Sequence, residues 1–204
     1  MPAKYDLLYF PMLKYASTVK TVQLFGKVPR LTVTESDGKE TSIWESRAIN
    51  EYLAVQLGFL PKNDELERSH LNSFACSVYE ITDKVNALQT HATPEERKAY
   101  WTRLLEIVPE RLKWHERYLA SKTDGPFYAG DKITLPDIVL YVQWTRWTEM
   151  FPEDAIINNE ATPNLLKLVE TCHNGPVGEI VQGWADVYQI SDHFDDEKVM
   201  WLYS

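Results

Sequence analysis

The fold of this chain is decided by two neighbouring stretches, which read Lys27-Val28-Pro29-Arg30-Leu31 and Glu45-Ser46-Arg47-Ala48-Ile49. A residue before proline is held extended, so the first stretch leads into a half-buried strand. Asp37-Gly38 then supplies a turn, and a second short strand at 41–44 precedes a helix that Gly58 terminates. The pattern therefore predicts a strand, a turn, a strand and a helix.

The same two stretches predict a site for a small peptide. If the Val28–Pro29 bond is cis, which X-Pro bonds alone adopt cheaply, the Val28 backbone groups face outward and pair with an extended ligand. Ser46, at the helix start, would place its hydroxyl and nearby N–H groups around a carboxylate, which the helix dipole also favours. Glu45 would hold an ammonium beside it. By spacing alone, a hairpin and a helix cap without any ligand explain these residues at least as well.

Two parts of the chain differ in their pattern. Residues 1–58 alternate strand and helix signals, 59–63 form a linker in which Pro61 ends the preceding helix, and 64–204 read as helix almost throughout. The helical part is expected to form helices at about 65–89, 93–119, 135–150, 163–172 and 177–184. A chain of 204 residues can bury a proper core as one domain or two small ones.

Two of these helices carry recognisable N-terminal caps. Thr93 with Glu96, and Thr134 with Asp137, have the three-residue spacing of a capping box. Pro109 falls inside the helix that begins at Thr93, and we expect it to kink or interrupt that helix because its nitrogen cannot donate a hydrogen bond.

Composition excludes several classes of function. A net charge of −9 and a pI near 5.1 argue against nucleic-acid binding, which needs clustered Lys and Arg. No segment approaches the roughly 20 apolar residues of a membrane span. The two cysteines, Cys76 and Cys172, form no CxxC pair, and the five histidines have no metal-ligand spacing. We expect a cytoplasmic protein without a metal cofactor.

Several stretches resemble one protein family when they are taken together. They are Tyr5-Asp6-Leu7-Leu8-Tyr9-Phe10-Pro11-Met12, Phe25 to Leu31, Asp37-Gly38, Glu45 to Ile49 with Tyr52-Leu53, and Phe127 to Ile138. The combination is similar to the cytosolic glutathione S-transferases, and its opening to the tyrosine-type, sigma-like members. The resemblance implies an α+β protein, with a thioredoxin-like glutathione-binding domain at 1–58 and an all-helical domain at 64–204, that works as a homodimer in detoxification.

The resemblance also assigns roles to residues. Glutathione is the co-substrate and Tyr9 the catalytic residue, because a hydroxyl that donates to the sulfur favours the thiolate over a thiol of pKa about 8.5. Lys27, Val28, Pro29, Glu45 and Ser46 would bind glutathione, and Asp83 would reach its amine across the dimer. Met12 and Leu13 would line the pocket for a hydrophobic electrophile. Without the resemblance, Tyr5, Leu7 and Tyr9 read as one face of a buried strand.

The spacing departs from the family in one place. Only nineteen residues separate Tyr9 from Pro29, roughly half of what a helix, a strand and a second helix require. The sequence therefore predicts a truncated first domain that lacks an edge strand and the residues that normally hold the glycyl carboxylate. Lys14, Lys27 and Arg30 are possible substitutes. Two alternatives stay open, namely a non-catalytic interaction module on the same fold and a truncated isoform of an active enzyme.

Overall fold

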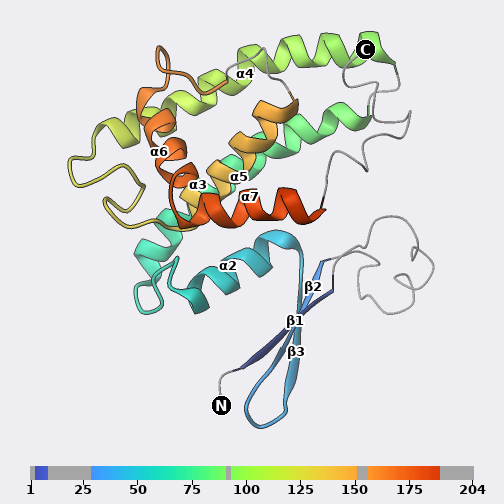
Figure 1. The fold of residues 1–204 in the computed structure, drawn as a ribbon, viewed down its shortest axis with the longest axis vertical. Coiled ribbons are helices and arrows are strands. Elements are labelled where there is room, and N and C mark those ends of the chain that lie inside the picture. Colours follow the sequence, from blue (N-terminus) through green and yellow to red (C-terminus); the bar gives the residue numbers. More distant parts are fainter. Residues whose placement is uncertain (1–2, 9–28, 91–92, 151–155, 189–204) are drawn as a thin grey trace. The chain divides into compact units, whose positions relative to one another are not determined.

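The computed structural model describes residues 3–8, 29–90, 93–150 and 156–188. The chain divides into two compact units, Met1–Lys62 and Asn63–Ser204. Figure 1 shows the strands and one helix in the first unit and helices in the second. The predicted division into an α/β part and a helical part agrees with this arrangement.

The first unit contains a three-stranded antiparallel sheet in the order β1 (Lys4–Leu8), β2 (Arg30–Thr34) and β3 (Glu40–Trp44). The helix α2 (Ser46–Leu57) follows β3 directly. Leu31 and Val33 alternate inward along β2, as period-two burial requires, and pack with Ile49 of α2. This small apolar cluster fixes α2 on one face of the sheet.

The turn between β2 and β3 and the end of α2 lie where the sequence predicts them. In the β2–β3 turn the Lys39 N–H donates to Asp37 Oδ1 at 2.9 Å, and Gly38 takes a φ of 86°, which glycine adopts without strain. Gly58 caps the C-terminus of α2 in the left-handed conformation, with a φ of 83°. The predicted hairpin turn and helix stop are both confirmed.

Strand β1 lies at one edge of the described sheet. Tyr5 and Leu7 pair in register with Val33 and Leu31, so they point to the same face. The β2 residues are buried, but Tyr5 is 42% and Leu7 55% exposed. The apolar face is therefore covered over β2 but only in part over β1, where the Tyr5 ring contacts Tyr52 of α2, and the interpretation of Tyr5 and Leu7 as a buried strand face is wrong.

The second unit contains five α-helices and a 3-10 turn within the described residues. They are α3 (Glu65–Asn86), η1 (Ala87–Thr90), α4 (Pro94–Ala120), α5 (Leu135–Met150), α6 (Pro163–His173) and α7 (Pro176–Tyr188). Each lies close to its predicted range. Helix α4 continues through Pro109, so Pro109 does not interrupt it, and a kink at this residue stays a prediction.

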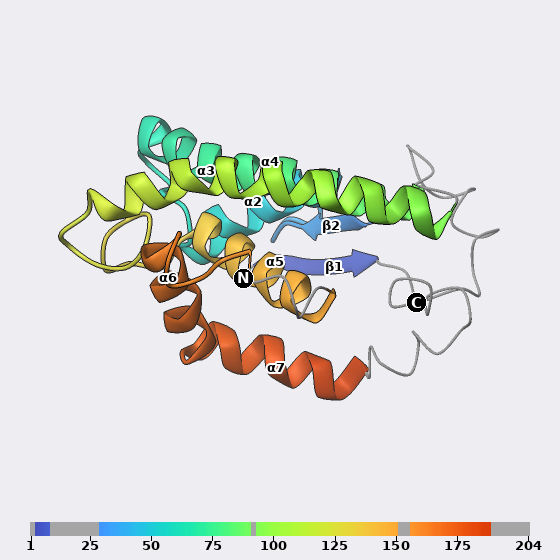
Figure 2. The same ribbon diagram turned by 90° about the horizontal axis from the view of Figure 1, so that it is seen from above.

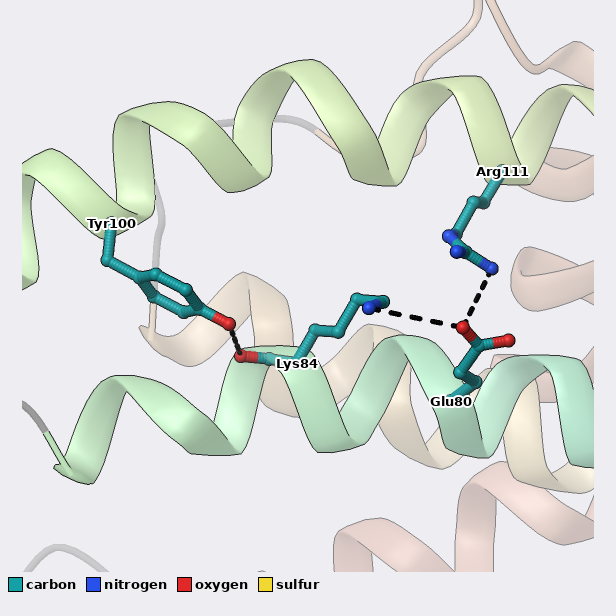
Figure 3. Close-up of polar contacts among 4 residues, drawn as sticks. All are labelled: Glu80, Lys84, Tyr100 and Arg111. Carbon is teal, nitrogen blue, oxygen red and sulfur yellow. Dashed lines mark hydrogen bonds and ion pairs between the residues drawn. The ribbon is translucent and has the colours of Figure 1, made fainter.

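Helices α3 and α4 lie side by side and antiparallel, as both views show (Figures 1 and 2). Figure 3 shows one of their polar contacts, in which Glu80 of α3 pairs with Arg111 of α4 at 3.0 Å. Nearer the other end, the Tyr100 hydroxyl of α4 donates to the Lys84 carbonyl at 3.0 Å. Helix α5 packs against α3 and α6, and its Leu140 and Tyr141 are fully buried.

Candidate functional site

The β2–β3 hairpin brings predicted site residues together at one end of the sheet. Arg30, the first residue of β2, is in register with Trp44, the last residue of β3. Pro29 therefore enters the sheet beside the point where Glu45 leaves it. Leu8, the last residue of β1, is also in register with Arg30. All three strands have an end at this place.

Glu45 has a strained backbone. Its φ of 69° and ψ of 123° make it the one non-glycine residue with positive φ in the described part of the chain. Such conformations cost of the order of 1–3 kcal/mol and gather at functional sites. The Glu45 carbonyl accepts the Ile49 N–H at 3.0 Å, so Glu45 is the N-cap residue of α2.

Helix α2 begins differently from α3 and α4. Asp64 accepts the Glu67 N–H at the start of α3, and Thr93 accepts the Glu96 N–H at the start of α4. Glu45 makes no such side-chain bond at the start of α2. Glu45 and Ser46 are both exposed. Because the first N–H groups of any helix lack intrahelical partners, this terminus is suited to an anionic ligand.

Arg30 lies beside this helix terminus and carries a polar atom without a partner. Its Nε is buried and makes no hydrogen bond among the described residues. A buried guanidinium donor without an acceptor is costly, and a carboxylate is the group that guanidinium binds best. Along β2, the Arg30 side chain points to the face opposite Leu31, away from the apolar cluster.

Other predicted site residues lie elsewhere. Tyr9, Met12, Leu13, Lys27 and Val28 fall outside the described residues, and so does the Val28–Pro29 peptide bond. Asp83 is described: it is an exposed residue of α3, in the second unit.

A second polar cluster is buried at the start of α5. Asp137 is fully buried and accepts the Thr134 N–H at 2.7 Å, the Thr134 hydroxyl at 2.6 Å and the Tyr128 N–H at 3.0 Å. Burial raises the pKa of Asp137 to about 6, and these hydrogen bonds oppose the rise. The predicted pairing of Thr134 with Asp137 is confirmed, whereas the bond to Tyr128 was not predicted.

The role of His115 was not predicted from the sequence. Its ring is buried and bonds to Ser77 and Tyr128, which lie 38 and 13 residues away in the chain. No local pattern connects residues at such separations. A polar residue on the inward face of α4, in line with Leu112 and Leu119, was the available signal.

The described residues contain no group of three or more His, Cys, Asp or Glu that could hold a metal ion. None of the helices in this part of the chain is both long and apolar enough to cross a membrane.

Comparisons with known proteins agree on one family. Residues 77–176 match the sequence model of the glutathione S-transferase C-terminal domain. Over 137 residues the chain is 27% identical to the glutathione S-transferase class-mu 28 kDa isozyme of Schistosoma bovis, covering 63% of this chain and 60% of that protein. The chain thus spans about three fifths of the length of this curated relative.

Solved structures show the same fold. The Pi-class glutathione S-transferase of Onchocerca volvulus superposes with a TM-score of 0.68 and 22% identity, over 86% of this chain and 78% of that one. The sigma-class glutathione S-transferase of Fasciola hepatica superposes with a TM-score of 0.62 and 26% identity, over 76% of this chain and 71% of that one. The first unit is thus a thioredoxin-like domain and the second the helical domain that accompanies it. The family model, the curated relative and the solved structures together support a protein of the cytosolic glutathione S-transferase family.

Proposed function

We propose that this protein is a glutathione S-transferase that conjugates the thiolate of glutathione to hydrophobic electrophiles. The observation that carries the proposal is the meeting of Pro29, Arg30 and the strained Glu45 at the start of α2. Residues 1–58 would form the glutathione-binding domain, 59–63 the linker and 64–204 the helical domain. Family membership supports a cytoplasmic location.

The γ-glutamyl end of glutathione carries a carboxylate and an ammonium on one carbon. In the proposed complex Ser46 and the N-terminus of α2 bind the carboxylate, and Glu45 binds the ammonium. The exposure of both side chains and the absence of a side-chain cap on α2 support these roles. Val28 would pair with the peptide backbone beside Pro29, with Lys27 next to them.

The glycyl carboxylate needs a cation. We assign this role to Arg30, because its buried Nε has no hydrogen-bond partner in the described part of the chain. Arg30 would replace the residues that the short segment between Tyr9 and Pro29 lacks. Lys14 and Lys27 are the alternatives.

Tyr9 would stabilise the thiolate by donating its hydroxyl hydrogen bond to the sulfur. Met12 and Leu13 would contact the electrophile, and Asp83 would reach the glutathione amine of the partner subunit. The position of Leu8 at the same end of the sheet as Pro29 and Glu45 supports the proposal for Tyr9, the next residue.

Calorimetric titration with glutathione tests the binding site. Ser46→Ala should weaken binding by about 10- to 100-fold, since a hydrogen bond to a charged group contributes about 1.5–3 kcal/mol. Ser69→Ala, at an exposed position of α3, is the matched control and should bind like wild type. A wild-type Kd weaker than ~10 mM would rule the site out.

The same titration tests the cation. Arg30→Gln should weaken glutathione binding, and Arg146→Gln, at an exposed position of α5, should not. Undiminished binding by the Arg30 variant would leave the two lysines as the candidates.

A conjugation assay with a model electrophile tests the chemistry. Tyr9→Phe should lower kcat about 100-fold and leave the glutathione Kd unchanged. Full turnover in this variant would exclude Tyr9 as the catalytic residue.

A non-catalytic interaction module on the same fold is the second candidate. The exposure of Tyr5 and Leu7 on the edge strand favours it, since an incomplete first domain would bind glutathione poorly. This candidate predicts no heat of binding in a calorimetric titration with glutathione. It also predicts that a protein partner is recovered in pull-downs. A truncated isoform predicts, in addition, transcripts in which the region encoding residues 13–25 is longer.

A homodimer is the proposed assembly. Leu66 of α3 and Trp114 of α4 are 83% and 70% exposed, so both apolar side chains are accessible to a second subunit. Light scattering should give twice the chain mass, and Trp114→Gln should weaken the dimer. A wild-type mass equal to one chain would exclude this assembly.

A further inference from the structure

Two sets of hydrogen bonds, which residue Tyr128 joins through its side chain and its backbone, cross the interior of the second unit. Ser77 Oγ of α3 is 3.0 Å from His115 Nε2, and His115 Nδ1 is 2.7 Å from the Tyr128 hydroxyl. The Tyr128 N–H donates to Asp137 Oδ1 at 3.0 Å, and Asp137 Oδ2 accepts from Thr134. This buried hydrogen-bond chain joins α3, α4, the 121–134 loop and the start of α5.

The geometry decides which nitrogen of His115 carries the proton. Tyr128 is fully buried, and its hydroxyl has His115 Nδ1 as its described partner. If Nδ1 carried the proton, the hydroxyl would accept that bond and its own hydrogen would be buried without an acceptor, which costs about 1–3 kcal/mol. With the proton on Nε2, Tyr128 donates to Nδ1 and Nε2 donates to Ser77. Both bonds are then satisfied, so the neutral Nε2–H tautomer is the stable one.

A second proton on His115 breaks this arrangement. Both ring nitrogens then donate, so the Tyr128 hydroxyl must turn its hydrogen away from Nδ1. The ring is also enclosed by Phe74, whose centroid is 5.9 Å away, and by the Tyr128 ring at 5.8 Å. Neither aromatic side chain carries a charge that would compensate an imidazolium.

The charged and titratable groups around the chain are already engaged. On α3, Glu80 pairs with Arg111 and Lys84, and His70 contacts Tyr118. On α4, Glu116 accepts N–H groups at the start of α6. On α5, Asp137 accepts from Thr134 and Tyr128, and on α6 Cys172 is buried. Among the described residues, none of these carboxylates bonds to the His115 ring, and burial lowers the pKa of His115 to about 4.

We propose that the buried hydrogen-bond chain is an acid-sensitive device: it holds the 121–134 loop against α3, α4 and α5 while His115 is neutral, and releases that loop when His115 is protonated. The inference does not depend on the proposed enzymatic function, because every residue in the chain lies in the second unit and none belongs to the candidate glutathione site.

The sign of the effect follows from proton linkage. His115 has a lowered pKa in the folded state, so between about pH 6.5 and 4 the unfolded chain binds more protons and stability falls as the pH falls. Asp137 has a raised pKa in the folded state, so its contribution over about pH 4–6 changes in the opposite direction. These two contributions therefore oppose each other in the pH profile of the wild type.

The test compares wild type with His115→Gln in urea unfolding, where the contribution of Asp137 cancels. The ratio of their unfolding constants, wild type over variant, should rise about 20-fold from pH 7 to pH 5. His70→Gln is the matched control, because His70 is an exposed histidine of the same aromatic cluster. Its ratio to wild type should stay constant. Parallel profiles for wild type and His115→Gln would overturn the proposal.

Measurements on the wild-type chain keep the proposal testable if His115→Gln does not fold. Nitrogen-15 imidazole shifts should show the Nε2–H tautomer at pH 7 and no protonation of His115 above about pH 5. Exchange of the Tyr128 amide should accelerate at pH 5 relative to buried amides of α4, after correction for intrinsic rates. Tyr128→Phe removes the hydroxyl that bonds to His115 and should accelerate exchange of the residue 128 amide already at pH 7, as acid does in the wild type. An Nδ1–H tautomer, or an exchange rate in this variant at pH 7 as slow as that of the wild type, would contradict the mechanism.

Discussion

The N-termini of α2 and α5 differ in whether side chains of the protein form hydrogen bonds with the backbone there. At α5 the carboxylate of Asp137 accepts three hydrogen bonds inside the protein. At α2 the N-cap residue Glu45 makes no side-chain bond, is exposed and has a strained backbone. A helix start whose polar groups are hydrogen-bonded within the protein contributes to stability. A helix start that is exposed and has a strained backbone is available to a ligand. This difference separates a structural terminus from a candidate binding terminus.

Removing Asp137 should have the largest effect on the free energy of unfolding. Asp137→Ala leaves two backbone N–H groups and one hydroxyl buried without an acceptor, so we expect a loss of roughly 3 kcal/mol or more. Asp64→Ala, at the exposed cap of α3, should cost about 1 kcal/mol. Urea unfolding monitored by tryptophan fluorescence measures both. Equal losses would mean that burial of the cap does not matter.

A smaller loss is expected at the start of α6, where the cap comes from another helix. Glu116 of α4 accepts the N–H groups of Asn164 and Leu165 at 3.1 and 2.9 Å. Glu116→Gln turns an amide N–H₂ towards one of these donors and should cost about 1–2 kcal/mol. Glu106→Gln, at an exposed position of the same helix, should change the free energy of unfolding by less than about 0.5 kcal/mol. A loss in both variants would indicate a general effect of charge on α4.

The sequence predicted contacts between residues close in the chain and did not predict contacts between distant residues. Thr93 and Glu96, Gly58, and Asp37-Gly38 act on residues within a few positions, so the local pattern predicted them. Glu116 binds residues 48 and 49 positions away, and His115 binds Ser77 at a separation of 38. Such pairs depend on how helices pack, which periodicity does not specify.

The candidate site was predicted in part for the same reason. A hairpin fixes which residues leave its open end together, so the meeting of Pro29 and Glu45 follows from a correct turn at Asp37-Gly38. The strained φ of Glu45 could not be predicted, because a non-glycine residue gives no local signal for positive φ. The unpartnered Nε of Arg30 depends on its neighbours in three dimensions.

The N-terminus of α4 is capped by side chains of the protein itself, as that of α5 is, but it is exposed to solvent. Thr93 Oγ1 accepts the Glu96 N–H at 3.2 Å, and the Glu96 carboxylate accepts the Thr93 N–H at 3.0 Å. Thr93→Ala should lower the free energy of unfolding by about 1 kcal/mol. Thr102→Ala, in the middle of the same helix, removes a threonine that bonds only to the Lys98 carbonyl and should be neutral or slightly stabilising. Equal destabilisation by both would argue against a capping role.

At the start of α2 we expect the smallest change in stability, and it should have the opposite sign. Glycine adopts positive φ at little cost, so Glu45→Gly should relieve strain and raise the free energy of unfolding by up to about 1 kcal/mol, net of the greater flexibility of the unfolded chain. Loss of the carboxylate should at the same time weaken glutathione binding in calorimetry.

Glu45→Gln separates the two effects. It keeps the backbone strain and removes the charge, so stability should stay within about 0.5 kcal/mol of wild type while glutathione affinity still falls. If Glu45→Gly instead destabilised the protein as Thr93→Ala does, the α2 terminus would be one more structural cap. If both variants bound glutathione like wild type, the strain at Glu45 would have no connection with the ligand, and the contrast between α2 and α5 would concern stability alone.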